Sequence, residues 1–342
     1  MRAALFRRHG GSEVLEIAEV PIPEPGPGEV LLRVRAAALN RLDLWVREGW
    51  EGLKLPLPHV GGSDIAGEVA KLGQGVAGWQ AGERVAVNPS LSCGACDMCR
   101  AGEDCLCKDY RILGEHTWGG FAEFVLVPAA NLVRIPAGFA FEAAAAAPLA
   151  SMTAWRAVMA RGRLRAGETL LVVGGGGGVA TYAIQIGKLA GARVIATTST
   201  EEKAKRLREL GADEVVNYKT QDWGREVWKL TGKRGADLVL DSVGKTTFMT
   251  SVRCTARGGR IACCGGTTGQ QWELDIRPVY WRGIDILGTT MANRAETETV
   301  LGLVWQGKLK PIVDSTVPLA RIREAHELLE RSEQFGKVVL TV

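Results

Sequence analysis

The sequence predicts an α/β protein with two domains, one built on a doubly wound parallel sheet and the other rich in short strands. Strand-like and helical runs alternate between residues 170 and 291, whereas the first 130 residues hold strand-like runs broken by Gly and Pro. The length of 342 residues also exceeds that of one ordinary hydrophobic core. We place the β-rich domain at 1–147 and 292–342, and the sheet domain at 148–291.

The β-rich domain should begin with a strand and a turn, because its N-terminal stretch lacks the apolar region of a signal peptide. The Pro-Gly segment 21–29 predicts a loop, and strand-like runs follow at 29–39, 63–73, 82–88 and 120–128. No run of about 18 apolar residues occurs, so we expect no membrane span. A net charge of +4 without blocks of like charge gives no reason to expect a nucleic-acid partner, and we expect a cytoplasmic protein.

A cysteine cluster predicts a metal site within the β-rich domain. Cys93, Cys96, Cys99 and Cys107 lie in a turn-rich lobe at 92–108. Four thiolates form a closed tetrahedral site of the kind that holds structural zinc, with no open position for chemistry. Disulfides fit less well, because eight cysteines scattered over 342 residues do not form a secreted framework. An iron–sulfur cluster also fits less well, since no Pro follows the fourth cysteine. We interpret Cys105 as a bystander.

The sheet domain should contain six strands connected mainly through helices. Expected strands are 170–174, 193–198, 214–218, 236–243, 259–265 and 283–291; expected helices are 179–190, 201–210, 222–232 and a stretch near 245–256. Alternation of this kind predicts βαβ units and a parallel sheet covered on both faces. The Ala run at 143–147 should lie in a helix joining the domains, and helices near 295–307 and 321–332 should precede a final strand, GKVVLTV.

A glycine-rich turn predicts that the sheet domain is a Rossmann-type dinucleotide-binding domain. Gly175-x-Gly177-x-x-Ala180 directly follows a buried strand and opens a helix, which is the context that the dinucleotide fingerprint requires. Gly178 and Val179 would begin the helix whose free N–H groups face the pyrophosphate. Other cofactor-binding candidates lie where later strands end, since nucleotides bind at that edge; they are Asp241, Val243, Gly265, Gly266, Thr267, Thr289 and Met291.

The second strand of this domain predicts NADPH, with NADH less favoured. An NAD site usually has an acidic residue about 20 residues after the fingerprint, where it binds the ribose 2′-hydroxyl. This chain instead has Thr198 and Ser199 there, and Glu201 is the first carboxylate. Lys203 could bind a 2′-phosphate, although it could equally be a solvated helix residue, and Tyr218 could cover the adenosine.

Together these features resemble the medium-chain dehydrogenase/reductase superfamily, in which a GroES-like β-rich catalytic domain carries an inserted dinucleotide domain. The resemblance rests on the cysteine lobe and on the segments 61–73, 119–124, 174–197, 210–218 and 335–340. The lobe resembles the structural-zinc loop of the family's alcohol dehydrogenases, and the remainder resembles its quinone oxidoreductase branch. The resemblance implies that Thr153 lies near the nicotinamide and that Lys337 belongs to a turn closing over the cofactor. It also implies dimers or tetramers.

The sequence departs from the family where a catalytic zinc would bind. The family's zinc ligands are typically an early Cys, a His-Glu pair after a Gly, and a Cys or Asp near the domain junction. Residues 38–43 and 148–153 contain no cysteine, and Ser63-Asp64 stands in place of His-Glu. A catalytic zinc generally needs three protein ligands. The possible substitutes are His59, Asp43, Asp64 and Glu68, whereas we expect His326 to belong to an exposed helix. The quinone oxidoreductase branch has an Asn-x-x-Asp pair near the nicotinamide, which Asn40 and Asp43 match.

Without a Lewis acid, hydride transfer to a plain ketone lacks stabilisation of the developing alkoxide. A quinone, an α,β-unsaturated carbonyl or an enoyl thioester delocalises the charge, and hydrogen-bond donors can stabilise it. We therefore expect an NADPH-dependent oxidoreductase acting on such an acceptor without catalytic zinc. Two alternatives remain: an alcohol dehydrogenase with an atypical metal site around His59 or Asp64, and a non-catalytic NADPH-binding regulatory protein. The strand at 283–291 would be an exposed sheet edge that a second copy could pair with.

Overall fold

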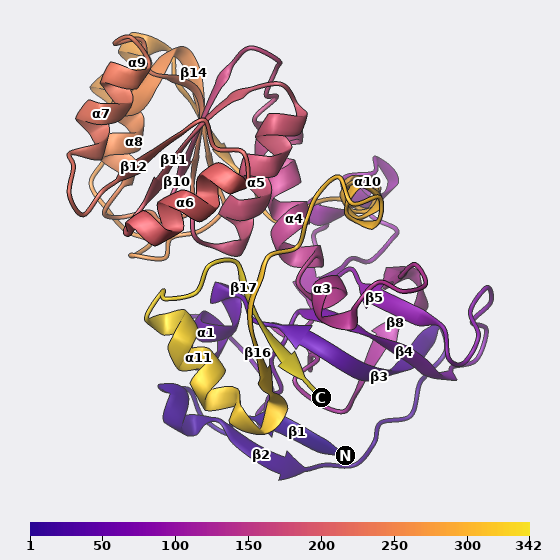
Figure 1. The fold of residues 1–342 in the computed structure, drawn as a ribbon. Helices are drawn as coiled ribbons and strands as arrows, with labels where there is room; N and C mark the ends of the chain where they lie inside the picture. The colour runs from indigo at the N-terminus through magenta and orange to yellow at the C-terminus, as the bar shows by residue number, and fades with distance from the viewer. The chain divides into compact units, whose positions relative to one another are not determined.

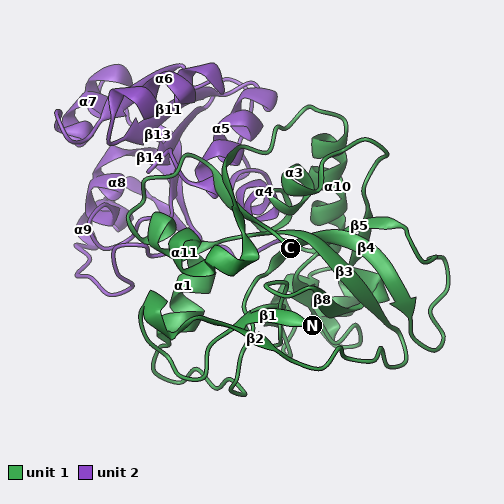
Figure 2. Ribbon diagram, turned by 60° about the horizontal axis from the view of Figure 1, so that its bottom comes forward, with its two compact units in different colours: residues 1–149, 293–342 green, residues 150–292 purple.

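The computed structural model describes residues 1–342 and divides into two compact units (Figure 2). Unit 1 comprises Met1–Leu149 and Asn293–Val342, and unit 2 comprises Ala150–Ala292. Unit 2 is therefore inserted into the chain of unit 1. None of the helices is long and apolar enough to cross a membrane.

Unit 2 is a six-stranded parallel sheet with helices packed on it (Figure 1). The strand order is β12-β11-β10-β13-β14-β15, which is the doubly wound order 3-2-1-4-5-6. The strands are β10 (Thr169–Val173), β11 (Arg193–Thr198), β12 (Glu214–Asn217), β13 (Ala236–Asp241), β14 (Thr255–Cys263) and β15 (Asp285–Gly288). The helices are α4 (Pro148–Trp155, which begins in unit 1), α5 (Gly178–Leu189), α6 (Glu201–Glu209), α7 (Trp223–Leu230), α8 (Phe248–Cys254) and α9 (Arg277–Arg282).

The apolar run at β10 explains its central place in this sheet. All five residues of β10 are buried, because helices cover both faces and leave no polar side for the strand. Burying each Leu or Val contributes roughly 1.5–3 kcal/mol to folding. Two details differ from the sequence-based expectation: β15 is four residues long rather than nine, and α9 interrupts a stretch where no helix was expected.

Unit 1 contains a seven-stranded sheet in the order β16-β17-β3-β4-β5-β9, with β8 also paired to β3. These strands are β3 (Glu29–Ala38), β4 (Asp64–Leu72), β5 (Arg84–Val87), β8 (Phe124–Pro128), β9 (Leu132–Arg134), β16 (Val313–Pro318) and β17 (Lys337–Thr341). Two small sheets pair β1 (Arg2–Leu5) with β2 (Glu16–Glu19) and β6 (Ser90–Leu91) with β7 (Arg111–Ile112). The helices are α1 (Arg41–Glu48), α2 (Asp97–Arg100), α3 (Phe141–Ala145), α10 (Arg294–Trp305) and α11 (Ile322–Glu330).

The register of unit 1 brings three distant segments to one place. Ala38, where β3 ends, is paired with Asp64 at the start of β4 on one side and with Val339 of β17 on the other. Lys337 at the start of β17 therefore lies beside the first residue of β4 and the segment leading into α1. The sequence did not predict α1 or β16.

One histidine also differs from expectation. We expected His326 on the exposed face of its helix, but its side chain in α11 is buried, with 1% exposed. The apolar face of α11 packs on the unit 1 core, and His326 lies on that face with Ile322 and Leu329. Its ring meets Phe121 edge-on at 6.1 Å between centroids.

Candidate active site

The start of α1 places Asn40 and Asp43 in the interior of unit 1. Asn40 is the N-cap residue of the helix and Asp43 lies in its first turn. The Asp43 carboxylate accepts hydrogen bonds from the N–H of Asn40 at 2.7 Å and from the N–H of Gly62 at 3.0 Å. Burial raises the pKa of Asp43 to about 7, although these hydrogen bonds and the nearby Lys337 cation oppose the increase.

A buried ion pair joins α1, β4 and β17. Lys337 Nζ lies 2.8 Å from Asp64 Oδ2 and also donates to Asn40 Oδ1. Asn40 Nδ2 donates to the same Asp64 oxygen at 3.0 Å, and the N–H of Leu149 donates to Asp64 Oδ1 at 2.7 Å. The side chains of Lys337 and Asp64 are 4% and 0% exposed. Such a pair is stable in the interior only because every polar atom has a partner, as here.

This network does not fit a catalytic zinc. Both Asp64 oxygens are engaged, and the Lys337 ammonium beside them would repel a divalent cation. Glu68 instead pairs with Arg35 at 2.7 Å, and His59 contacts the Gly114 carbonyl oxygen through Nε2 at 3.1 Å. The four cysteines form the one group of three or more potential ligands whose atoms converge. His59, Asp64 and Glu68 therefore do not converge as a set.

Glu115 is a neighbour of this site that the sequence did not indicate. It follows Gly114, whose backbone packs directly on Gly62 and Ser63. Burial raises the pKa of Glu115 to about 7, and the charge of Asp43 adds to the increase. A single glutamate in a turn carries no recognisable pattern, so only its burial in the folded chain reveals it.

In unit 2 the structure brings Thr153 and Met291 together. Thr153 Oγ1 lies 3.8 Å from the Met291 sulfur, and both residues are buried. Met291 has φ of 44°, a left-handed conformation that a non-glycine residue rarely adopts. This backbone aims the thioether at Thr153 in α4, so the two predicted residues form one small cluster.

The glycine-rich turn has the local geometry of a phosphate-binding loop. Gly174 has φ of 75°, and its N–H donates to Thr197 Oγ1 at 3.0 Å. A Cβ at Gly175 would lie 2.8 Å from a Leu207 methyl carbon, whereas a Cβ at Gly177 would meet nothing within 4 Å. The first position therefore needs glycine for packing, and the second opens onto free space at the N-terminus of α5, where N–H groups lack helical partners.

Beyond this turn, the predicted ribose-binding residues lie at the ends of β11 and β12. Thr198 is buried, and Tyr218 is 43% exposed just after β12. Thr200 caps α6 by accepting a hydrogen bond from the N–H of Lys203 at 3.2 Å. Ser199 lies directly before this cap and is half-buried. Glu201 is held by Asn217, whose Nδ2 donates to its carboxylate at 2.9 Å.

Asp241 organises the turn after β13. Its buried carboxylate accepts from the N–H groups of Val243 and Gly244 at 2.9 and 3.0 Å, from Thr247 Oγ1 at 2.9 Å and from Ser251 Oγ at 2.6 Å. Both Asp241 oxygens are engaged in these hydrogen bonds, so this residue would support a cofactor through the turn.

The turn after β14 is hydrogen-bonded to the turn that Asp241 organises. Thr267 Oγ1 donates to Ser242 O at 3.2 Å. A Cβ at Gly244 would lie 2.9 Å from the Gly266 Cα, so the two turns touch closely. Gly265 opens the second turn, and Thr289 follows β15, where its N–H donates to Cys263 O at 3.0 Å. The predicted residues Val243, Gly265, Gly266, Thr267 and Thr289 thus share one sheet edge.

The cysteine lobe fits a tetrahedral metal ion. The sulfur atoms of Cys93, Cys96, Cys99 and Cys107 all lie within 4.8 Å of one another, and a zinc ion at about 2.3 Å from each would place them about 3.8 Å apart. The N–H groups of Cys93 and Asp109 each donate to Cys107 Sγ at 3.3 Å. Backbone N–H groups lower the pKa of Cys96 to about 6, whereas burial raises that of Cys99 to about 11. Metal binding would release the retained protons.

Two family models match the chain. The model described as "Alcohol dehydrogenase GroES-like domain" matches residues 26–137, and the "Zinc-binding dehydrogenase" model matches residues 178–306. Both matches agree with the β-rich and doubly wound architectures of units 1 and 2.

Three individual proteins illustrate the range of relatives. The chain is 33% identical to an acryloyl-coenzyme A reductase from Metallosphaera sedula, over 100% of both chains. It is 28% identical to a quinone oxidoreductase from Homo sapiens, over 99% of this chain and 97% of the relative. The crystal structure of an NAD-dependent alcohol dehydrogenase superposes on this chain with a TM-score of 0.97 at 50% identity, over 100% of both chains.

Proposed function

Because the chain belongs to the medium-chain dehydrogenase/reductase superfamily and is an oxidoreductase, we propose that it reduces an activated acceptor without a catalytic zinc. The acceptor class is an α,β-unsaturated carbonyl, an enoyl thioester above all, or a quinone. The bound nicotinamide cofactor supplies a hydride, and the carbon or ring system that receives it holds the resulting charge by delocalisation.

The observation that carries this proposal is the Lys337–Asp64–Asn40 network. In a zinc-dependent enzyme, the positions around Asp64 would contribute metal ligands with free lone pairs. Here the lone pairs of Asp64 are committed to Lys337, Asn40 and the Leu149 N–H. The network instead fixes Asn40 and, through its backbone N–H, Asp43 in one orientation. A rigid network of polar side chains can orient a substrate carbonyl without reorganising during the reaction.

Asn40, Asp43 and Thr153 remain the proposed catalytic residues, as the resemblance implies. The Asn40 amide is oriented by two partners, and Asp43 has a pKa that allows it to hold or release a proton near pH 7. Thr153 contributes a hydroxyl whose position Met291 restricts. Asn40→Ala removes the amide and should lower kcat/KM strongly. Asn40→Asp and Asn40→Gln should change the fold little.

NADPH remains the proposed cofactor. Supporting it, no acidic side chain lies at the end of β11, where Thr198 and Ser199 stand. Opposing it, Asn217 holds the Glu201 carboxylate near this strand end. Titration of the protein with NADPH and NADH, followed by nucleotide fluorescence, decides between them. Tighter binding of NADH, unaffected by Lys203→Ala, would contradict the proposal.

The test of the acceptor class combines metal counting with a substrate panel. We expect one zinc per chain by mass spectrometry of the native protein, and NADPH oxidation with enoyl thioesters, enones or quinones that survives removal of weakly bound metal. Oxidation of simple alcohols that disappears on chelation would overturn the proposal. That outcome would favour the second candidate, an alcohol dehydrogenase, which the 50% identity to an NAD-dependent alcohol dehydrogenase supports.

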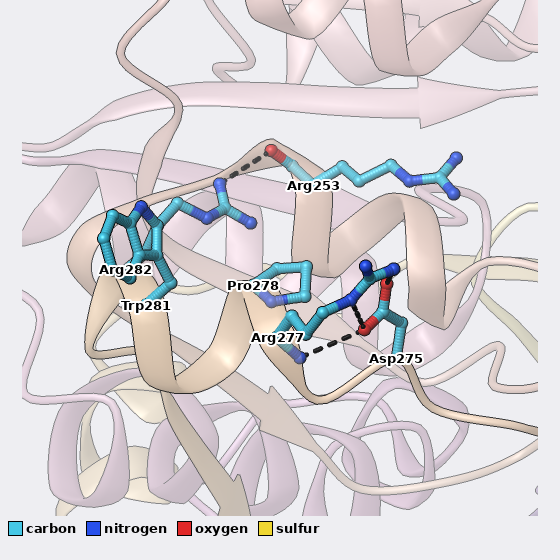
Figure 3. A pocket seen from close by; sticks show the side chains of 6 residues that line it. All are labelled: Arg253, Asp275, Arg277, Pro278, Trp281 and Arg282. Atoms are coloured by element: carbon cyan, nitrogen blue, oxygen red, sulfur yellow. Dashed lines mark hydrogen bonds and ion pairs between the residues drawn. The ribbon is translucent and has the colours of Figure 1, made fainter.

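We also propose that a second copy of the chain pairs with the β15 edge. β15 ends the sheet of unit 2, and Ile286 within it is 39% exposed. The adjacent α9 exposes Tyr280 and Trp281, which are 66% and 71% exposed. Trp281 borders an open pocket of about 480 Å³, where Arg277 is paired with Asp275 and Arg282 donates to the Arg253 carbonyl oxygen (Figure 3).

An unpaired strand edge next to exposed aromatic residues is unfavourable in water, and a two-fold partner would cover both. Sedimentation equilibrium should give a dimer or tetramer, and Ile286→Lys should shift it toward monomer. A wild-type chain that sediments as a monomer at micromolar concentration would contradict the proposal.

A further inference from the structure

The turn at residues 113–117 is fixed against the segment that carries the candidate site. Within it, the N–H of Gly114 donates to Thr117 O at 3.0 Å, and the N–H of Glu115 donates to Ile112 O at 3.1 Å. A Cβ at Gly114 would lie 2.6 Å from the Gly62 carbonyl carbon, which is closer than real Cβ contacts. The turn therefore packs backbone to backbone on Gly62, the residue whose N–H binds Asp43.

Glu115 presents a nearly buried carboxyl group in this turn without a hydrogen-bond donor. The residue is 8% exposed, and its closest charged contact is His116 Nε2 at 3.7 Å from Oε1, beyond hydrogen-bond distance. The His116 ring is held in its neutral form, because burial lowers its pKa and its Nδ1 accepts a hydrogen bond from the Ile112 N–H at 3.1 Å. A buried carboxylate without donors is costly, so this environment favours the neutral acid, with a pKa of about 7.

The charged groups around Glu115 strengthen this preference. The charge of Asp43 acts on it, and two interacting carboxyl groups resist simultaneous ionisation. Lys337 and Asp64 pair with each other at 2.8 Å, and their charges act on Asp43 in opposite directions. Burial lowers the pKa of His59, which adds no positive charge, and Arg111 acts on the His116 ring. Near pH 7 the pair of Asp43 and Glu115 should therefore retain a proton.

Glu115 is better placed than Asp43 to pass that proton on. Both Asp43 oxygens accept backbone N–H bonds, and its side chain is enclosed. The Glu115 side chain is 11% exposed, so one edge of it meets solvent. The Glu115 carboxyl can therefore donate its proton and afterwards be protonated again by water.

We propose that Glu115 is the proton donor to the α-carbon of an α,β-unsaturated thioester, a role that rests on the proposed function. The hydride forms a C–H bond at the β-carbon, and the alkene π electrons move to form an enolate. The enolate electrons then form a second C–H bond at the α-carbon with the Glu115 carboxyl proton, as the O–H bond breaks. Glu115 ends as a carboxylate and recovers its proton from water.

The decisive variant is Glu115→Gln, which keeps the shape of the side chain and removes the proton. A matched control is Glu123→Gln, since Glu123 forms a surface pair with Arg2 at 2.9 Å. Crotonyl-coenzyme A and a benzoquinone serve as acceptors, because quinone reduction requires no carbon protonation. We expect Glu115→Gln to lower kcat on the thioester by roughly 100-fold or more, to leave quinone reduction within about threefold, and Glu123→Gln to change neither.

Two further measurements distinguish proton donation by Glu115 from a purely structural role of its side chain. The wild-type thioester rate should fall as pH rises through about 7, whereas the quinone rate should not follow this decrease. Infrared difference spectra of the cofactor-free protein between pH 5.5 and 8.5 should show one protonated carboxyl fewer in Glu115→Gln than in the wild type.

Equal losses on both acceptors, or an unchanged thioester rate, would overturn the role of Glu115 while leaving the proposed function intact. An infrared spectrum in which Glu115 is already ionised at pH 5.5 would overturn it as well. A wild-type protein that reduces neither acceptor would instead overturn the proposed function, and the role of Glu115 with it.

Discussion

Replacing Lys337 with Met should destabilise unit 1 by an amount typical of a broken buried ion pair. The change keeps a long flexible side chain and removes the ammonium that lies 2.8 Å from Asp64 Oδ2. The buried Asp64 carboxylate then has only Asn40 and the Leu149 N–H as donors and no counter-ion. Loss of one partner from such a pair costs about 3–5 kcal/mol.

The assay is urea unfolding followed by the tryptophan fluorescence of the whole chain. Lys71→Met is the control, because Lys71 also lies in unit 1 and forms an exposed pair with Glu24. Exposed pairs contribute only about 0–1 kcal/mol. Adding Asp64→Asn to Lys337→Met should restore much of the lost stability, since the uncompensated charge disappears. The reasoning is refuted if Lys337→Met costs no more than the control, or if the double variant is less stable than Lys337→Met.

Three further predictions concern other parts of the chain. Cys93→Ser should lower the zinc content from one per chain to near zero in native mass spectrometry and increase proteolysis within the lobe, with nucleotide binding retained; full zinc retention would contradict the assignment. Gly114→Ala should cost at least about 2 kcal/mol, because it combines a left-handed φ of 82° with a 2.6 Å approach to Gly62. Gly102→Ala, with a φ of 79° and open space, should cost only about 1 kcal/mol in the same unfolding assay. Burial lowers the pKa of His326 to about 3, so the folded state binds fewer protons than the unfolded state between about pH 3 and 6.5. Stability should therefore fall by a few kcal/mol as pH decreases through that range, and His326→Gln should flatten this part of the curve measured by thermal unfolding at successive pH values.

Local patterns accounted for the parts of the fold that are contiguous in sequence. The buried strand β10, the glycine turn after it and the cysteine lobe each depend on residues within about 15 positions of one another, so spacing alone indicated them. The doubly wound order followed from the same alternation, because parallel strands need crossover connections. The sequence did not indicate α1, since RLDLWVRE is short, only half of its residues are apolar, and it gains its stability from packing and capping.

Long-range partners could not be predicted from one sequence. Lys337 and Asp64 are 273 residues apart, and their contact depends on the register of β17 and β4 against β3. Sequence reasoning assigned Lys337 to a turn over the cofactor and left Asp64 as a possible metal ligand, whereas the structure shows that each side chain binds the other. His326 was misjudged for a related reason: the helical period identifies an apolar face but not which polar residue that face buries.

The pairing of β17 with β3 has a consequence for biosynthesis. Residues 150–292 form a complete sheet among themselves, so unit 2 can fold on the ribosome while the remainder of the chain is still being made. Unit 1 must wait, because β3 pairs with β4 and β8 early but acquires β17 only after residues 337–341 emerge. Until that moment Asp64 lacks its counter-ion. Chaperones would therefore bind a nascent chain in which the N-terminal part of unit 1, although made first, is still incompletely folded.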